Sequence, residues 1–359
     1  MSRLAGLSRA AVEAVLDERD FSGVVHVVGD ADEVPLTLKR GLADRANEIP
    51  NTIATRFAAA SVSKLVTGMT VARLVDAGTI AWSARYAALV PAEWRPPAMD
   101  PSVTLHQLLT HTSGFGDYFD EEGAEPYEAI WTRTPATTIR GPKDFWPLLR
   151  DLPQLVPPGT RGVYDNGTFV LVGIALEEVS GLRFPELVSR EVFEPLGMAD
   201  SGFWALDDIL PRLAVGYLPP EEGALPGSRG ERWRTNVHAV PAMGGPDGGV
   251  QVTAPDLVRL LDGLFGRGDG SSFLSAATRA HLIGPHADDG DDFRFGCGVL
   301  HVGEGPSTRF GHTGEDPGAS ARAWVYPATG ERVAVLSNVT DGGGDVTRRI
   351  DALLAAIPG

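Results

Sequence analysis

The stretch FAAASVSK, residues 57–64, is an apolar run that leads into a helix predicted over residues 61–77. Residues three apart share one face of a helix and adjacent residues do not, so Ser61 is expected to meet Lys64 while Ser63 points elsewhere. A serine hydroxyl needs a neighbouring base to become a nucleophile. A lysine can be that base when burial and the positive end of a helix lower its pKa. The S-x-x-K spacing therefore indicates nucleophilic chemistry, although an ordinary helix start gives the same pattern.

A second group, Tyr164-Asp165-Asn166, lies just before a helix predicted over residues 168–179. A tyrosine oxygen can relay a proton between a nucleophile and a leaving group. The Asn166 amide offers both a donor and an acceptor to a substrate ester or amide. Taken alone, this group is equally typical of a turn with an asparagine cap.

The third group is His312-Thr313-Gly314, which we place at the start of a C-terminal strand pair. Gly314 allows a ligand to approach the backbone closely. The N–H of Glu315 could join the Ser61 N–H as an oxyanion hole.

These three groups, in this order, make the chain resemble the serine β-lactamases and penicillin-binding DD-peptidases. The similarity is strongest to the class C β-lactamase-like group, which includes esterases and D-aminopeptidases. Further shared signatures are Leu108–Gly114 (LLTHTSG), Pro195–Met198 (PLGM), Gly248-Gly249 and Thr253–Asp256 (TAPD). The resemblance spans residues 41–338.

The resemblance implies an α+β fold, in which an antiparallel sheet flanked by helices faces a mainly helical lobe across the active-site cleft. It also implies a covalent acyl-enzyme. Ser61 would be the nucleophile, and Lys64 with Tyr164 would be the base for acylation and would activate the deacylating water. Asn166 would hold the acyl side of the substrate. The opposite wall would be formed by His312, Thr313 and Gly314, followed by Glu315.

Three departures from the family pattern bear on the substrate. Many relatives carry lysine at the position of His312, where it attracts a substrate carboxylate. Glu315 and Asp316 place two acids near the cleft, and Asp165 adds another nearby. Like charges disfavour a carboxylate-bearing substrate. We therefore expect neutral esters or amides rather than β-lactams or peptidoglycan.

Composition excludes several other classes of protein. The chain of 359 residues has a formal net charge of −16, so it is a poor candidate for binding nucleic acid or an anionic membrane. One cysteine, Cys297, excludes an internal disulfide. The first twenty residues carry seven charged side chains and lack the apolar segment of a secretory signal, which predicts a cytoplasmic protein. The oligomeric state is left open.

Hydrophobic periodicity and turn residues predict the order of elements. Helices are expected at residues 8–20, 61–77, 104–110, 168–179, 253–264 and 346–357, and strands at 21–28, 34–42, 293–302, 320–326 and 332–337. Thr104 with Gln107 and Thr253 with Asp256 match capping boxes, and Gly181 is expected to stop the helix over residues 168–179. Strands at both ends of the chain predict one domain over residues 1–359, and the resemblance implies that this domain is β-lactamase-like. Its α/β lobe would comprise about residues 1–80 and 290–359, with a mainly helical lobe over about 81–289.

Other patterns predict no additional site. The remaining histidines lack metal-ligand spacing, so neither a metal nor a cofactor is expected. Cys297 is placed on a strand as inert packing. His111 is interpreted as structural. The G-x-S-x-G and P-loop motifs are absent, which counts against an α/β-hydrolase and a nucleotide site.

The sequence thus predicts a serine hydrolase for small ester or amide substrates, most readily an esterase. One alternative is a D-amino-acid-specific peptidase, a DD-carboxypeptidase or a weak class C-type β-lactamase. Transfer of the acyl group to an alcohol or amine is a variant of the same chemistry. The alternative of another class is a non-catalytic ligand-binding protein on the same fold.

Overall fold

The computed structural model describes residues 3–357 apart from 30–32, 120–126, 222–227 and 291–292. Its centre is an antiparallel sheet of eight strands in the order β2-β1-β14-β13-β12-β11-β10-β9. The strands are β1 (Gly23–Val28), β2 (Leu36–Arg40), β9 (Ala287–Asp288), β10 (Arg294–Phe295), β11 (Leu300–Val302), β12 (Arg309–Asp316), β13 (Ala319–Val325) and β14 (Arg332–Ser337). The first two strands pair with the last one, so the two ends of the chain build one sheet.

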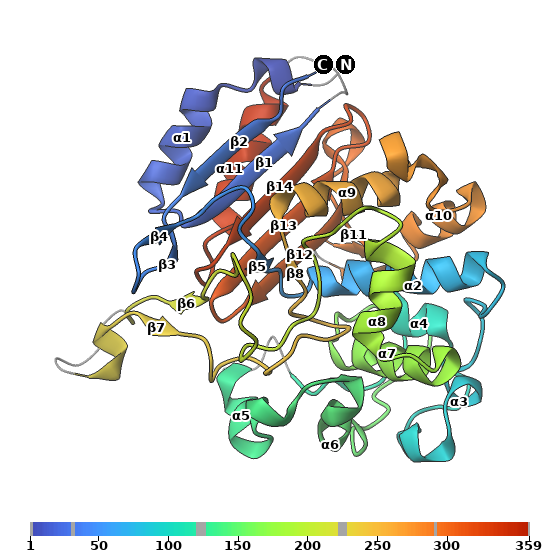
Figure 1. Cartoon of the computed structure of the whole chain (residues 1–359). Helices are drawn as coiled ribbons and strands as arrows, with labels where there is room; N and C mark the ends of the chain where they lie inside the picture. The colour runs from blue at the N-terminus through green and yellow to red at the C-terminus, as the bar shows by residue number, and fades with distance from the viewer. Residues whose placement is uncertain (1–2, 30–32, 120–126, 222–227, 291–292, 358–359) are drawn as a thin grey trace.

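Helices cover both faces of this sheet (Figure 1). One face carries α1 (Arg9–Glu18) and α11 (Gly344–Ala355), and the other carries α2 (Val62–Asp76) and α9 (Ala254–Phe265). Alternate residues of a strand point to opposite faces. Accordingly, Val25 packs in the core beneath α1 and α11, whereas Val24 packs in the core around α2.

The middle of the chain adds further elements, most of which lie below the sheet in Figure 1, whereas α10 (Ala276–Ile283) lies to its right beside α9. The remaining α-helices are α3 (Tyr86–Leu89), α4 (Leu105–Leu109), α5 (Ile130–Arg133), α6 (Trp146–Leu149), α7 (Gly167–Ser180) and α8 (Phe184–Val188). The two-stranded ribbons pair β3 (Leu42–Asp44) with β4 (Ile49–Pro50), β5 (Phe57–Ala58) with β8 (Gln251–Val252), and β6 (Tyr217–Leu218) with β7 (Arg234–Thr235). Although α9 lies within the range predicted for the helical lobe, it packs on β13 and β14. In the part of the chain described, no helix has the length and apolar character needed to cross a bilayer.

Several predicted helix signals are confirmed. Thr104 and Gln107 form the reciprocal capping box at the start of α4. Gly181 ends α7 with φ 68°, a conformation that glycine adopts without a steric penalty. Thr253 caps α9 by accepting from the Asp256 N–H, but the Asp256 carboxylate does not return to the cap.

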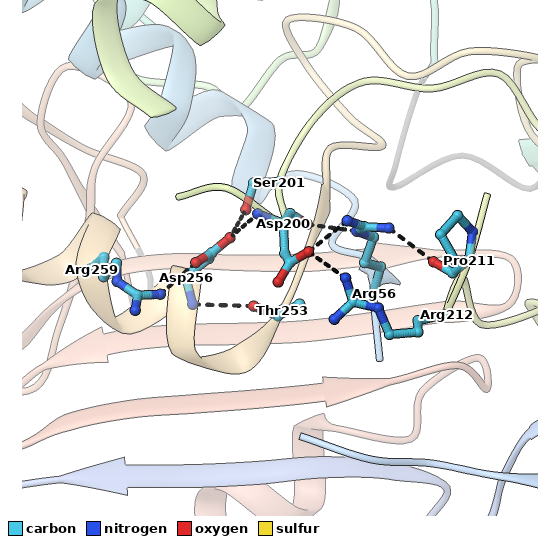
Figure 2. Close-up of polar contacts among 8 residues, drawn as sticks. All are labelled: Arg56, Asp200, Ser201, Pro211, Arg212, Thr253, Asp256 and Arg259. Carbon is cyan, nitrogen blue, oxygen red and sulfur yellow. Dashed lines mark hydrogen bonds and ion pairs between the residues drawn. The ribbon is translucent and has the colours of Figure 1, made fainter. Parts of the chain in front are cut away.

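The Asp256 carboxylate instead belongs to a polar network that anchors the chain before β5 (Figure 2). It accepts hydrogen bonds from the Asp200 N–H at 2.9 Å and the Ser201 hydroxyl at 2.8 Å. The Asp200 carboxylate in turn pairs with the Arg56 guanidinium at 2.6 Å. Arg56 directly precedes β5, so the network fixes the strand that leads to Ser61.

The strand prediction missed the short strands β3–β9 and was wrong at two further segments. Residues 309–316, expected to begin a strand only near His312, form the full strand β12. The predicted strand over residues 293–302 is two strands, β10 and β11, joined by a turn that contains Cys297. Cys297 is therefore in a connection and not on a strand, although it is fully buried.

Candidate active site

Ser61 and Lys64 meet at the N-terminus of α2. Ser61 is the N-cap residue, and the Lys64 Nζ lies 2.9 Å from the Ser61 Oγ. Ser63 points away and accepts a hydrogen bond from the Val250 N–H. Ala60, just before Ser61, has φ 45°, which is strained for a residue with a Cβ atom. Such strain is typical of positions where the surrounding structure holds a side chain in a functional orientation.

The Lys64 side chain is fully buried and has two further acceptors. Its Nζ donates to the Asn166 Oδ1 at 2.7 Å and to the Asp247 carbonyl at 2.9 Å. Three fixed partners hold the amine within reach of the serine oxygen, in one geometry. To take a proton from Ser61, the amine must first be in its neutral form.

Tyr164 lies beside the Lys64 amine. The Lys64 Nζ is 4.7 Å from the centroid of the Tyr164 ring. The His111 ring stacks on the Tyr164 ring, with the two centroids 4.7 Å apart. The His111 Nδ1 accepts a hydrogen bond from the Asp165 N–H. His111 therefore supports Tyr164 by packing.

Asn166 is oriented by Asp117, a residue that the sequence analysis missed. The Asp117 Oδ2 accepts from the Asn166 N–H at 2.8 Å and from the Asn166 Nδ2 at 3.1 Å. The Asp117 Oδ1 accepts from the N–H groups of Gly167 and Tyr118. These bonds turn the amide oxygen of Asn166 toward Lys64. Burial raises the pKa of Asp117, and these donors together with the charge of Lys64 oppose that rise.

The neighbouring Asp165 does not add a charge to the cleft. Its side chain accepts from the Thr168 N–H at 2.7 Å and so caps the first turn of α7. It is buried, and burial, followed by the proximity of Asp117, raises its pKa.

Strand β12 runs directly beside the nucleophile. A Cβ atom on Gly314 would lie 2.2 Å from the Ala59 carbonyl oxygen and 2.9 Å from the Ser61 nitrogen, so only glycine permits this approach. Thr313 precedes it on the same strand. The close contact brings the backbone of Gly314 next to the backbone nitrogen of Ser61.

His312 is fully buried and neutral. Its Nδ1 donates to the Thr313 carbonyl at 2.5 Å. Burial, followed by the charge of Lys64, lowers the pKa of His312 to about 3. Unlike a lysine, this side chain presents no positive charge to a substrate.

Ser61 opens into a pocket of about 380 Å³. Of the residues of β12, Glu315 and Asp316 line this pocket and His312 does not. The lining comprises Ser61, Tyr118, Phe119, Tyr127, Asn166, Asp247, Gly248, Glu315, Asp316, Pro317 and Thr340. Among these described residues there is no lysine or arginine.

The acids of the pocket differ in how far they are neutralised. Glu315 pairs with Arg322 at 2.5 Å and accepts from the Ser320 hydroxyl. The Asp247 carboxylate accepts from the Tyr118 hydroxyl at 2.5 Å, and burial raises its pKa. A smaller pocket of about 50 Å³ shares Asp247 and Asp316 with the first and is lined on its other side by Trp204 and other apolar residues.

This fold and this arrangement of serine, lysine, tyrosine and asparagine define a serine hydrolase of the type that forms an acyl-enzyme. A family model described as Beta-lactamase matches residues 9–357, and the chain belongs to this family. The resemblance seen in the sequence and the predicted fold class are thereby confirmed.

Individual relatives agree with this assignment. A solved penicillin-binding protein from Bacillus halodurans is 34% identical, with a TM-score of 0.86, over 95% of this chain and 99% of that one. Penicillin-binding protein 4 of Amycolatopsis lactamdurans is 29% identical over 327 residues, 88% of this chain and 79% of the relative. Esterase EstB of Burkholderia gladioli is 34% identical over 222 residues, 60% of this chain and 55% of EstB. The chain thus aligns with only about half of EstB's length.

Proposed function

We propose that the chain hydrolyses small neutral esters or amides through an acyl-enzyme on Ser61, with esterase activity foremost. The observation that carries this proposal is the 2.9 Å contact between a fully buried Lys64 amine and the Ser61 oxygen, at the wall of a pocket of about 380 Å³. The name of the relative EstB is in keeping with it.

The proposed reaction proceeds in two halves. Lys64, as the neutral amine, takes the proton of Ser61 while the serine oxygen attacks the substrate carbonyl carbon. The N–H groups of Ser61 and Glu315 hold the resulting oxyanion. As the tetrahedral intermediate collapses, Tyr164 passes a proton to the departing alcohol or amine. Asn166 donates its amide N–H to the acyl side of the substrate.

Deacylation repeats these steps with water. Tyr164, with Lys64 beside its ring, removes a proton from water that attacks the acyl carbon, and the proton returns to Ser61 as the acid leaves. An alcohol or amine that enters instead of water would give acyl transfer. Competition by hydroxylamine during ester turnover measures that partition directly.

The charges around the pocket determine the substrate class that we propose. The described lining residues include Asp316 and Asp247 but no lysine or arginine, so they offer a carboxylate-bearing substrate no cation to pair with. We therefore expect β-lactams and DD-peptides to be poorer substrates than neutral esters. The same acids favour a substrate that carries an ammonium group, so a D-aminoacyl amide is the second candidate.

The test compares a nitrophenyl ester, a D-aminoacyl amide and a chromogenic cephalosporin on the wild type and on Ser61→Ala. We expect the ester to turn over fastest, and every activity to be lost in the folded variant. Ester turnover that persists in a folded Ser61→Ala protein would refute the proposal. No turnover and no acyl adduct in the wild type would favour a non-catalytic binding protein. A small-molecule substrate, no nucleic-acid or membrane partner and a cytoplasmic location remain predictions.

A further inference from the structure

Three histidines and the cysteine of the chain come together at a second place in the fold, away from Ser61. His106 lies on α4, His281 on α10, His286 in the loop after α10, and Cys297 in the turn between β10 and β11. Each contributes one potential ligand atom, and these atoms all lie within 4.8 Å of one another. We propose that these four residues form a binding site for a divalent transition metal ion, with Zn²⁺ as the metal that the ligand set fits best.

The distances are close to those of a tetrahedral zinc centre. Zinc bonds of about 2.0–2.1 Å to nitrogen and about 2.3 Å to sulfur put two nitrogens about 3.3 Å apart and a nitrogen and a sulfur about 3.6 Å apart. The His106 Nδ1 is 3.2 Å from the His281 Nε2 and 3.9 Å from the Cys297 Sγ. Shifts of a few tenths of an ångström in side chains would therefore complete this part of the coordination shell.

The backbone holds the contributing segments together without a metal. The Cys297 N–H donates to the Leu282 carbonyl, next to His281, at 3.0 Å. The His286 N–H donates to the Phe295 carbonyl at 2.8 Å. The Gly298 N–H donates to the carbonyl of Leu109, on the helix of His106, at 2.9 Å. A site that is organised in this way loses little conformational entropy when a metal binds.

Each histidine must present an unprotonated ring nitrogen to the metal, and a backbone contact in this cluster favours that arrangement. The His286 Nε2 donates to the His281 carbonyl at 2.7 Å, a backbone bond of the kind that fixes the tautomer of metal-bound histidines. His286 is exposed and gives the ion a path to the buried cysteine.

Metal binding converts the Cys297 thiol to a thiolate, with release of its proton to solvent. A cysteine thiol without a metal carries its proton at neutral pH. One proton per metal ion should therefore appear in a weakly buffered solution. The site would also brace the active-site helix, because a Cβ atom on Gly298 would lie 2.4 Å from the Lys64 carbonyl oxygen, in α2.

The experiment uses the full chain without a polyhistidine tag. Zinc content after dialysis, and the absorption spectrum with Co²⁺ in place of zinc, are measured for the wild type and for His286→Gln, Cys297→Ala and His238→Gln. His286 is exposed, so its variant is expected to fold. His238 is an exposed histidine outside the cluster and serves as the control.

We expect one metal ion per chain, a thiolate-to-cobalt charge-transfer band that Cys297→Ala abolishes, and a higher unfolding temperature with Zn²⁺. His286→Gln should weaken binding by about a hundredfold or more, since even the loss of a group hydrogen-bonded to a ligand costs 10–100-fold. His238→Gln should match the wild type. Substoichiometric zinc, a cobalt spectrum without the thiolate band, or equal affinity in all variants would overturn the proposal. None of these results depends on the hydrolase activity.

Discussion

Replacement of Asp117 by asparagine tests how the active site is oriented. The Asp117 carboxylate accepts four hydrogen bonds, from the N–H and the side-chain amide of Asn166 and from the N–H groups of Gly167 and Tyr118. An asparagine has one side-chain oxygen, which can accept hydrogen bonds either from the two Asn166 donors or from the N–H groups of Gly167 and Tyr118. Its NH₂ group would then face the other two N–H groups and leave them unsatisfied.

The magnitude follows from these lost contacts. A hydrogen bond to a charged group contributes about 1.5–3 kcal/mol, so the loss of two costs about 3–6 kcal/mol. Removal of a buried charge offsets part of this cost, as the raised pKa of Asp117 indicates. We expect the free energy of unfolding to fall by about 3 kcal/mol. When the NH₂ group takes the place of Oδ2, the Asn166 side chain loses its acceptor on residue 117 and is held only by Lys64 among the contacts described. For this orientation we also expect kcat/KM to fall by about 10–100-fold, or about 1.4–2.7 kcal/mol.

Urea unfolding and steady-state turnover of a nitrophenyl ester measure the two effects. Asp151→Asn is the matched control, because the Asp151 side chain is 78% exposed and pairs only with the neighbouring Arg150 among the contacts described. It should leave both quantities unchanged. An Asp117→Asn protein with wild-type stability and wild-type kcat/KM would refute the role of Asp117 as the group that orients Asn166.

Further substitutions test the other parts of the account. Lys64→Met should lower kcat/KM for the ester by about 10³-fold or more, because it removes the proposed general base, and circular dichroism should show a retained fold. The pKa of His312, about 3 in the folded chain, lies below the ordinary histidine pKa of about 6.5, so the unfolded chain binds an extra proton as the pH falls from about 6.5 toward 3. The free energy of unfolding should therefore decrease as the pH decreases. Its slope against pH, measured by urea unfolding at pH 6.5, 5.5 and 4.5, should be smaller in His312→Leu by about 1.4 kcal/mol per pH unit. Equal slopes in the two proteins would contradict the buried neutral ring. Asp256→Ala should lower the free energy of unfolding by about 3 kcal/mol, because it removes the acceptor of two donors and the partner of Arg259. Arg259→Ala, at a half-exposed side chain, should lower it by less than about 1 kcal/mol in the same urea assay.

Local chemistry was sufficient to predict the features that depend on neighbours in sequence. The capping residue Thr104, the terminating Gly181 and the i, i+3 contact of Ser61 with Lys64 all act within one or two turns of chain. Each therefore leaves a readable pattern, and the structure confirms all three.

Features that depend on tertiary contact left a weaker signal. The length of β12 was missed because Gly311, Gly314 and two acids give it a low strand propensity, and packing against Ser61 overrides that propensity. Asp117 follows a glycine-containing run, and only the fold brings it to Asn166. An acid inside the run 114–118 (GFGDY) was the one available hint.

The histidine cluster was missed for the same reason. Its members come from separate segments, and the spacing of His281 and His286 matches no helical face. Motif spacing detects ligands that share a helix or a loop, whereas this cluster forms only when α4, α10 and the turn at Cys297 meet.

The most direct test of the central claim is the mass of the intact chain after reaction with a fluorophosphonate, followed by peptide mapping. The account predicts a single adduct, on Ser61, that Ser61→Ala abolishes and Ser63→Ala leaves in place. A folded wild-type chain without an adduct, or with the adduct on another serine, would contradict it.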